Sequence, residues 1–434
     1  MKGERSLFVG DPMSECYAFG RMPNTAMPDQ LADISRWIAD RALAGETETR
    51  ILAGACEGMA QLGNGLRRAA MGADTLHPVL LGRWFEWYRD RDDVKQTDYG
   101  RVAAPQSEEL WRRSPFYELF NTGQLRLRRR LTAAANSPPD FPILDELAAE
   151  GMTDYVAYCH RLGGIAVVGA MDCIFSSWTS DRADGFSDDH LVALDRIVPC
   201  VASAIVGISL GRIADTLVET YLGRDAGRRV LRGSIERGVA EHIRAVLWFS
   251  DLKGFTRLVD SVAPELVIPM LNDYAEAVVS AIHDHGGQVL KLIGDGVLAT
   301  FALDDPERAC ARTLDCVAEA MWRVEAVNER RTAQGLPVTG CYVGLHIGEV
   351  FYGNVGSTDR LDFTVIGPAV NELTRIAGMS RTLDQDIVLS SAFAAAAGPW
   401  RGCLVSLGRY ALRGVGRPQE LFTLDRENYR SREP

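Results

Sequence analysis

Residues 248–256 have the sequence Trp-Phe-Ser-Asp-Leu-Lys-Gly-Phe-Thr, and this stretch decides how the C-terminal half of the chain is interpreted. An uninterrupted apolar run over 245–250 predicts a strand in the middle of a sheet, because both faces of such a strand are covered. Asp251 follows at the end of that strand, and Gly254 supplies a turn before a helical segment. We therefore expect the Asp251 carboxylate at the C-terminal end of a central strand, beside main-chain N–H groups suited to phosphate.

The segments downstream alternate between helical and strand periodicity. A helix is predicted over 264–285, and Pro269 inside it is expected to bend it or to delay its start. The remaining elements are strands at 288–293 and 297–302, a helix opened by Asp304-Asp305-Pro306 and ending near Gly335, strands at 342–350 and 361–366, and a helix at 368–381. The order β-α-β-β-α-β predicts a ferredoxin-like core over about 244–426.

A second carboxylate, that of Asp295, is predicted to lie beside the end of the same strand. The sequence Gly294-Asp295-Gly296 is typical of a hairpin turn, which places Asp295 beside the end of the strand that delivers Asp251. An aspartate in a glycine turn is more often only a turn former. Two such carboxylates on adjacent strands, however, suit a hard cation such as Mg²⁺, which prefers carboxylate and phosphate oxygens.

Four blocks in this order are similar to the class III nucleotide cyclases: WFSDLKGFT, VLKLIGDGVLATF, GLHIGEVFYGNVG and RLDFTVIGPAVNELTRIAG. The metal ligands that the resemblance implies are Asp251, Asp295 and the carbonyl oxygen of Leu252, which would hold two Mg²⁺ or Mn²⁺ ions in each active site. The substrate-binding turn that follows comprises Gly254, Phe255 and Thr256.

The resemblance also implies that Lys291 and Thr364 recognise the base. Adenine offers an acceptor at N1 and a donor at its 6-amino group, whereas a lysine ammonium only donates and a threonine hydroxyl can accept. Guanine reverses both groups and would require an acceptor such as glutamate at position 291. The pair therefore favours ATP as substrate, with GTP as the alternative.

The family chemistry assigns three further residues. Asn371 and Arg375 would orient the ribose and stabilise the transition state, and their spacing of four places them on one helix face. Arg413, in the sequence LRGVG, would reach the terminal phosphates. The implied reaction is attack of the ribose 3′-oxygen on the α-phosphate, with pyrophosphate leaving and two metal ions assisting.

Because the family's active site lies between two cyclase domains, the resemblance implies a head-to-tail homodimer with shared sites and an inactive monomer. The chain departs from the family pattern at Thr364, where many relatives have aspartate, and at Pro368 and Glu372-Leu373-Thr374. The alternatives are a catalytically silent nucleotide-binding scaffold and a guanylate cyclase, which Lys291 disfavours.

The N-terminal half predicts a separate α+β domain over 31–210, after a flexible arm at 1–30. Helices are expected around 34–43 and 51–62, strands at 155–162 and 165–174, and a final helix capped by Ser187. These segments, including GMTDYVAYCHRL and GFSDDHLVALDRIVP, resemble GAF-like sensory domains, which often bind small molecules. A helical connector at 211–243 would link this domain to the cyclase domain, and 427–434 would be a tail.

Charge, hydropathy and cysteine spacing indicate which kinds of partner and ligand are disfavoured for this chain. The net charge of −11 over 434 residues argues against a general nucleic-acid binder. The longest uncharged stretch, 197–211, is shorter than the roughly 20 residues of a spanning helix, so we expect a buried or interface helix and a cytoplasmic protein. The basic run 125–131 predicts a solvated helix face. A metal or redox site is disfavoured by the absence of paired spacing among Cys159, His160, Cys173 and Cys200.

Overall fold

The computed structural model describes residues 27–100, 105–131, 141–164, 167–169 and 171–425. The chain divides into two compact units, Met1–Leu217 and Val218–Pro434. The predicted tail at 427–434 and most of the predicted arm lie outside the described residues. The part of the arm that is described, from Met27 onward, is already helical, so the arm is shorter than predicted.

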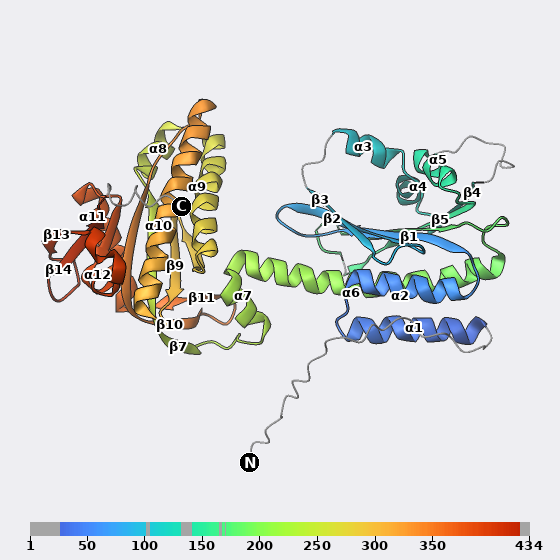
Figure 1. The fold of residues 1–434 in the computed structure, drawn as a ribbon, viewed down its shortest axis with the longest axis horizontal. Helices are drawn as coiled ribbons and strands as arrows, with labels where there is room; N and C mark the ends of the chain where they lie inside the picture. Colours follow the sequence, from blue (N-terminus) through green and yellow to red (C-terminus); the bar gives the residue numbers. More distant parts are fainter. Residues whose placement is uncertain (1–26, 101–104, 132–140, 165–166, 170, 426–434) are drawn as a thin grey trace, which may run out of the picture. The chain divides into compact units, whose positions relative to one another are not determined.

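The N-terminal unit is a six-stranded antiparallel sheet between two layers of helices (Figure 1). The strand order is β3-β2-β1-β6-β5-β4. Its elements are α1 (Met27–Leu43), α2 (Glu48–Gln61), β1 (Leu66–Asp74), β2 (Leu80–Tyr88), β3 (Lys95–Gly100), α3 (Pro105–Arg112), α4 (Pro115–Thr122), β4 (Arg126–Arg130), α5 (Pro142–Ala149), β5 (Asp154–Arg161), β6 (Cys173–Ser180) and the first part of α6 (Asp188–Leu222).

Two apolar cores hold these layers together. Helices α1, α2 and α6 cover one face of the sheet, where Trp178 and Met71 are fully buried. Helices α4 and α5 cover the other face through a cluster that includes Leu119 and Leu144. Ser187 caps α6 as predicted, since its Oγ accepts the His190 N–H at 3.3 Å. The α+β architecture is therefore present, while the GAF-like assignment stays a prediction.

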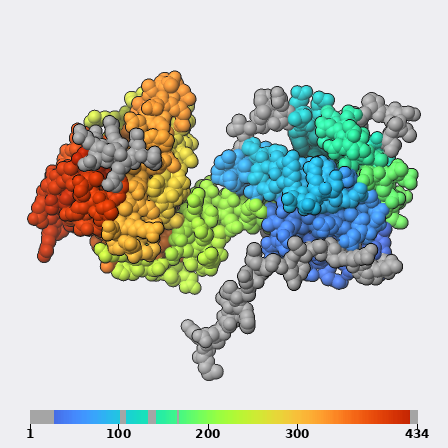
Figure 2. Space-filling model, in the orientation of Figure 1, coloured from blue at the N-terminus to red at the C-terminus, as the bar shows by residue number. Residues whose placement is uncertain are grey.

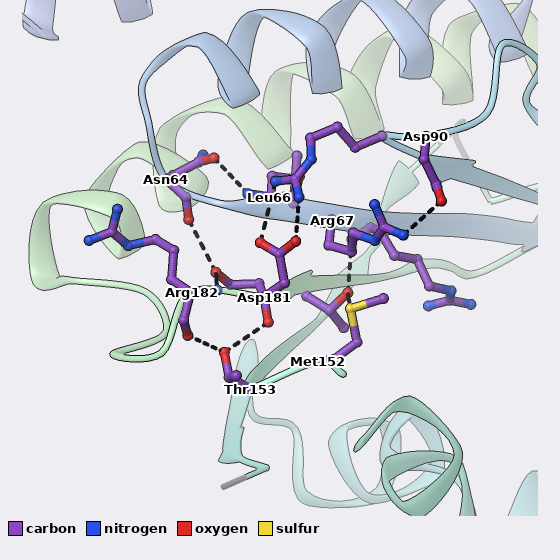
Figure 3. A network of polar contacts seen from close by, with 12 residues as sticks. Asn64, Leu66, Arg67, Asp90, Met152, Thr153, Asp181 and Arg182 are labelled. Carbon is purple, nitrogen blue, oxygen red and sulfur yellow. Dashed lines mark hydrogen bonds and ion pairs between the residues drawn. The ribbon is translucent and has the colours of Figure 1, made fainter. Parts of the chain in front are cut away.

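Polar contacts fix the turns at one end of this sheet (Figure 3). Asn64 Oδ1 accepts the Leu66 N–H at 2.9 Å, and Arg67 pairs with Asp90 at 2.7 Å. Thr153 Oγ1 donates to the carbonyl of Arg182. The first bond fixes the turn before β1, the second ties β1 to the end of β2, and the third ties the start of β5 to the end of β6.

Two predictions for this unit are wrong in detail. The second predicted strand, at 165–174, begins only at Cys173, although residues 165, 166 and 170 lie outside the described set. The basic run forms the strand β4, because its arginines find acidic partners such as Asp154 and Asp195 across neighbouring elements. Of the proposed cysteines, Cys159 and Cys173 face the α4–α5 core, whereas Cys200 lies on α6 against the other layer.

The C-terminal unit is built on an eight-stranded sheet in which β10-β7-β9-β8 form the centre and one edge. Its elements are α7 (Arg224–Leu231), β7 (Ala240–Leu252), α8 (Phe255–Ser261), α9 (Pro264–Asp284), β8 (Gln288–Ile293), β9 (Gly296–Ala302), α10 (Pro306–Ala333), β10 (Cys341–Gly356), β11 (Leu361–Ile366), α11 (Pro368–Leu383), β12 (Ile387–Ser390), α12 (Ser391–Ala396), the 3₁₀ helix η2 (Gly398–Cys403), β13 (Leu404–Tyr410) and β14 (Gln419–Leu424).

The apolar run before Asp251 is explained by burial on both faces of β7. Trp248 packs into a core shared with α9 and α10, which lie side by side over one face of the sheet (Figure 1). Leu247 faces the opposite core, together with Leu373 of α11. The space-filling view shows α10 at the surface of this unit (Figure 2). The predicted β-α-β-β-α-β order is observed from β7 to β10.

Most predicted boundaries in this unit are close to the observed ones. Helix α9 starts at Pro264 and continues through Pro269, so the start is not delayed. Asp305 caps α10, since its Oδ1 accepts the Arg308 N–H at 3.2 Å. Strands β7 and β10 are longer than predicted because they pair along 13 registered positions, from Cys341↔Leu252 to Gly353↔Ala240.

The connector differs from the predicted helix at 211–243. Helix α6 passes through Gly211 without a break and ends at Leu222, α7 ends at Leu231, and β7 has already begun at Ala240. By length and composition alone α6 would suffice to cross a membrane, and 39% of its most apolar window is buried within the fold. A core helix of a soluble protein meets the same criterion.

Candidate active site

Asp251 and Asp295 meet where β7 ends and the β8–β9 hairpin turns. Strands β7 and β9 are antiparallel with Ser250 opposite Val297, a register that brings Asp295 opposite Leu252. The Leu252 N–H donates to Asp295 Oδ2 at 3.2 Å. The two carboxylates predicted to share a cation are therefore brought together by strand pairing.

Burial and mutual repulsion both disfavour the ionised form of this carboxylate pair. Burial and then the adjacent Asp295 carboxylate raise the pKa of Asp251 to about 6, and Arg381 acts in the opposite direction. Two anions held this close repel one another unless a positive charge lies between them. Among the described residues no cluster of three or more His, Cys, Asp or Glu side chains forms a larger metal site. Two carboxylates and a nearby carbonyl suit Mg²⁺, which keeps positions for water and phosphate.

A cavity of about 170 Å³ opens beside the carboxylates. Its polar lining includes Asp251, Asp295 and Asn272, and its apolar wall comes mainly from α9 and the hairpin. The sequence analysis did not predict Asn272 as a site residue. Its spacing from Ile268 and Leu271 along the helix could have placed it on the face that lines the same cavity.

The glycine turn after Asp251 has the conformation that its sequence predicted. Gly254 has φ of 64°, in the left-handed region that other residues rarely occupy, and it precedes α8. Phe255 packs against the core, whereas Thr256 is exposed. The turn thus directs the chain from the strand end into α8.

Lys291 and Thr364 lie on β8 and β11. The Lys291 ammonium forms an ion pair with Asp362, which stands two residues before Thr364 on the same strand. Thr364 is 7% exposed, and its Oγ1 has no hydrogen-bond partner among the described residues. A buried hydroxyl without a partner is available to a ligand. Asp362 was missed by the sequence reasoning, although the period of two along β11 places it on the Thr364 face.

Asn371 and Arg375 are both exposed on α11, one helical turn apart. Arg413 is exposed in the loop between β13 and β14. The cavity beside Asp251 and Asp295 is not lined by any of the other predicted groups, Lys291, Thr364, Asn371, Arg375 or Arg413. The structure of one chain thus brings the two metal carboxylates together and leaves the base and ribose set apart from their cavity.

With this geometry in view, comparison with known proteins identifies the region. Residues 239–423 match the family described as the adenylate and guanylate cyclase catalytic domain. The C-terminal region is a class III cyclase catalytic domain. The matched residues begin directly before β7 and end in β14, so they include both carboxylates and all the predicted base and ribose residues.

Relatives support the same assignment. An adenylate cyclase of Anabaena cylindrica is 35% identical over 161 residues, which are 36% of this chain and 31% of the relative. Adenylate cyclase 1 of Rhizobium meliloti (strain 1021) is 28% identical over 39% of this chain and 26% of the relative. The chain thus spans about a third or less of the length of these curated relatives.

Among solved structures, the adenylyl cyclase CyaB from P. aeruginosa is 21% identical over 43% of this chain and 95% of that chain, with a TM-score of 0.39.

Proposed function

We propose that the chain is an adenylate cyclase that converts ATP into 3′,5′-cyclic AMP and pyrophosphate. The observation that carries the choice of ATP is the pair on β8 and β11: an ammonium that can only donate, at Lys291, and a buried hydroxyl, at Thr364, that has no hydrogen-bond partner in the described part of the chain. This pair complements N1 and the 6-amino group of adenine. Guanine would leave a donor facing Lys291, which costs affinity because the polar groups stay unpaired.

Asp251, Asp295 and the Leu252 carbonyl would hold two divalent ions, Mg²⁺ or Mn²⁺. When bound, such ions lower the pKa of the 3′-hydroxyl and neutralise phosphate charge. Gly254, Phe255 and Thr256 would place main-chain N–H groups near the phosphates. Asn371 would orient the ribose, and Arg375 would stabilise the charge that develops on the α-phosphate. Arg413 would bind the terminal phosphates.

The active form would be a head-to-tail homodimer. In one chain the carboxylate cavity and the base and ribose residues are separate, so a second copy would complete each site, and a two-fold axis would generate two equivalent sites. Exposed apolar side chains accompany these elements: Leu292 and Ile293 on the hairpin, and Phe351, Val355 and Ile366 on β10 and β11. Burial of these side chains would favour contact with a second copy.

The N-terminal unit would regulate catalysis in a cytoplasmic protein, in response to a small molecule. The connector would transmit the state of this unit, because α7 packs against the sheet that carries Lys291 and Thr364. A small displacement there would misalign a site shared between two subunits.

The test is cyclic nucleotide formation by the purified chain, with ATP and GTP offered separately and with Mg²⁺ or Mn²⁺. Asp251→Ala serves as the control. Cyclic AMP that disappears in the control supports the proposal, and a preference for GTP would assign a guanylate cyclase. ATP binding without any product, under every condition, would favour the catalytically silent scaffold.

A further inference from the structure

The main chain of Lys253, directly after the metal-site residues Asp251 and Leu252, is held at both of its polar groups. Its N–H donates to the Gly340 carbonyl at 2.9 Å. Its carbonyl accepts a hydrogen bond of 2.7 Å from Thr339 Oγ1. Thr339 and Gly340 belong to the loop between α10 and β10, so a segment distant in the sequence holds the two peptide groups on either side of the Lys253 Cα.

This bonding determines which way Leu252 faces. In an antiparallel pair, consecutive residues point their N–H and carbonyl groups alternately toward and away from the partner strand. Because Lys253 bonds toward Gly340, Leu252 must turn its own N–H and carbonyl to the opposite side. Its N–H indeed reaches Asp295 there, at 3.2 Å. The Leu252 carbonyl is thereby directed toward the side on which Asp295 stands.

Thr339 is itself anchored to the helical layer. Its N–H donates to Tyr274 Oη at 2.8 Å, and that hydroxyl bonds to Asn328, so α9 and α10 both support the loop. The Lys253 side chain adds a second tether, since its ammonium pairs with Asp386 and lies 5.3 Å from the centre of the Tyr342 ring. The Thr339 hydroxyl is therefore a rigidly placed donor.

We propose that Thr339 is a positioning residue for the metal site: its hydroxyl holds the Lys253 carbonyl and so steadies Lys253, whose N–H shares a peptide group with the Leu252 carbonyl that faces the cation. This role rests on the proposed function, because it requires the Asp251–Asp295 metal site. Residues that orient metal ligands typically change metal affinity 10–100-fold when removed. The main-chain bond to Gly340 does not depend on a side chain, so a Thr339 variant keeps the strand pairing. It leaves the Lys253 carbonyl, and with it the turn directly after Leu252, less firmly held.

The test is Mn²⁺ binding to the nucleotide-free full chain, measured by the electron paramagnetic resonance signal of free Mn²⁺. Thr339→Val keeps the side-chain volume and removes the donor, and it should weaken Mn²⁺ binding on the order of 10-fold. Thr339→Ser keeps the donor and should bind like the wild type. Thr332→Val, at an exposed position of α10, is the matched control and should change nothing. If Thr339→Val melts far below the wild type, Thr339→Ala is measured with the same expectation.

The outcomes separate the two proposals. Wild-type affinity in Thr339→Val or Thr339→Ala, together with weakened binding in Asp251→Asn, would overturn the positioning role alone. Wild-type affinity in Asp251→Asn, or no Mn²⁺ binding by the wild type, would overturn the metal site and the positioning role with it. Equal weakening in Thr339→Ser and Thr339→Val would also overturn it, because the serine hydroxyl retains the bond.

Discussion

Lys291 and Asp362 form an ion pair between β8 and β11, two strands that are 71 residues apart at these positions. The Lys291 side chain is 32% exposed and that of Asp362 is 52% exposed. Pairs this accessible contribute little to stability, typically less than about 1 kcal/mol. Asp362 thus restricts where the Lys291 ammonium lies without being needed for the fold.

Asp362→Asn should therefore alter base recognition more than folding. We expect KM for ATP to rise several-fold and the preference for ATP over GTP to fall, while the melting temperature stays within a few degrees. Steady-state kinetics with both nucleotides would measure this. Asp359→Asn, at an exposed position of the preceding loop, is the control. An unchanged KM and an unchanged preference would show that Asp362 does not orient Lys291.

Asp251 makes the metal-free protein less stable as it ionises. Its pKa is raised to about 6, so between about pH 4 and 6 the folded chain retains a proton that the unfolded chain has released. The free energy of unfolding therefore falls as pH rises through this window. Without metal, Asp251→Asn should melt above the wild type at pH 8, and the two should converge near pH 4.

The same carboxylate predicts how metal binding depends on pH. A bound divalent ion requires the ionised form, so wild-type Mn²⁺ affinity should fall about tenfold for each pH unit below about pH 6. Asp260→Asn, at an exposed position of α8, should follow the wild type in melting and in binding. Equal melting temperatures of wild type and Asp251→Asn at pH 8 would contradict the raised pKa.

Tyr352 of β10 bonds the connector helix α7 to the sheet of the C-terminal unit. Its hydroxyl donates to Asp225 Oδ2 at 2.8 Å, and the Arg229 guanidinium lies 5.2 Å from the centre of its ring. Its ring meets that of Phe363 edge to face, with centroids 4.8 Å apart, and Phe363 is flanked by Asp362 and Thr364. Contacts therefore continue from α7 to the strand proposed to recognise the base.

Tyr352→Phe removes one charge-assisted hydrogen bond at a buried site. We expect the free energy of unfolding of the C-terminal unit to fall by about 1–2 kcal/mol, and amides in α7 to exchange hydrogen faster. Urea unfolding and hydrogen exchange with mass spectrometry would measure the two effects. Tyr221→Phe, at an exposed position, should show neither. Unchanged protection of α7 would mean that Tyr352 does not hold the connector.

The parts of the fold that the sequence predicted are those with local signals. Pro264 and the Asp305-Pro306 pair mark the helix starts, and the Gly294-Asp295-Gly296 turn fixes the hairpin that places Asp295 near Asp251. Helix α6 continues through Gly211, where the sequence predicted the start of a connector, because tertiary packing and helix length outweigh one weak helix former.

Contacts between distant segments account for what the sequence missed. The arginine run at 125–131 became a strand because its partners, Asp154 and Asp195, lie on β5 and α6. Likewise, the Lys291–Asp362 pair and the bond from Thr339 to Lys253 join residues 71 and 86 positions apart. Sequence periodicity does not predict such pairs, because each depends on a strand register that only the folded chain defines.

The proposed dimer predicts complementation between two inactive variants. Asp251→Ala damages the metal half of each site, and Arg375→Ala damages the ribose and phosphate half, so each variant alone should form almost no cyclic AMP.

In a head-to-tail heterodimer both lesions fall in one site and the other site is intact. Equal mixing with random exchange should therefore restore about a quarter of the wild-type activity, since half of the dimers would each carry one working site. The measurement is cyclic AMP formation after mixing. A mixture of Asp251→Ala with Asp295→Ala is the matched control, because both lesions fall in the metal half and every site stays damaged. Activity that no mixing ratio restores, although mixed dimers are detected, would contradict a site shared between two chains.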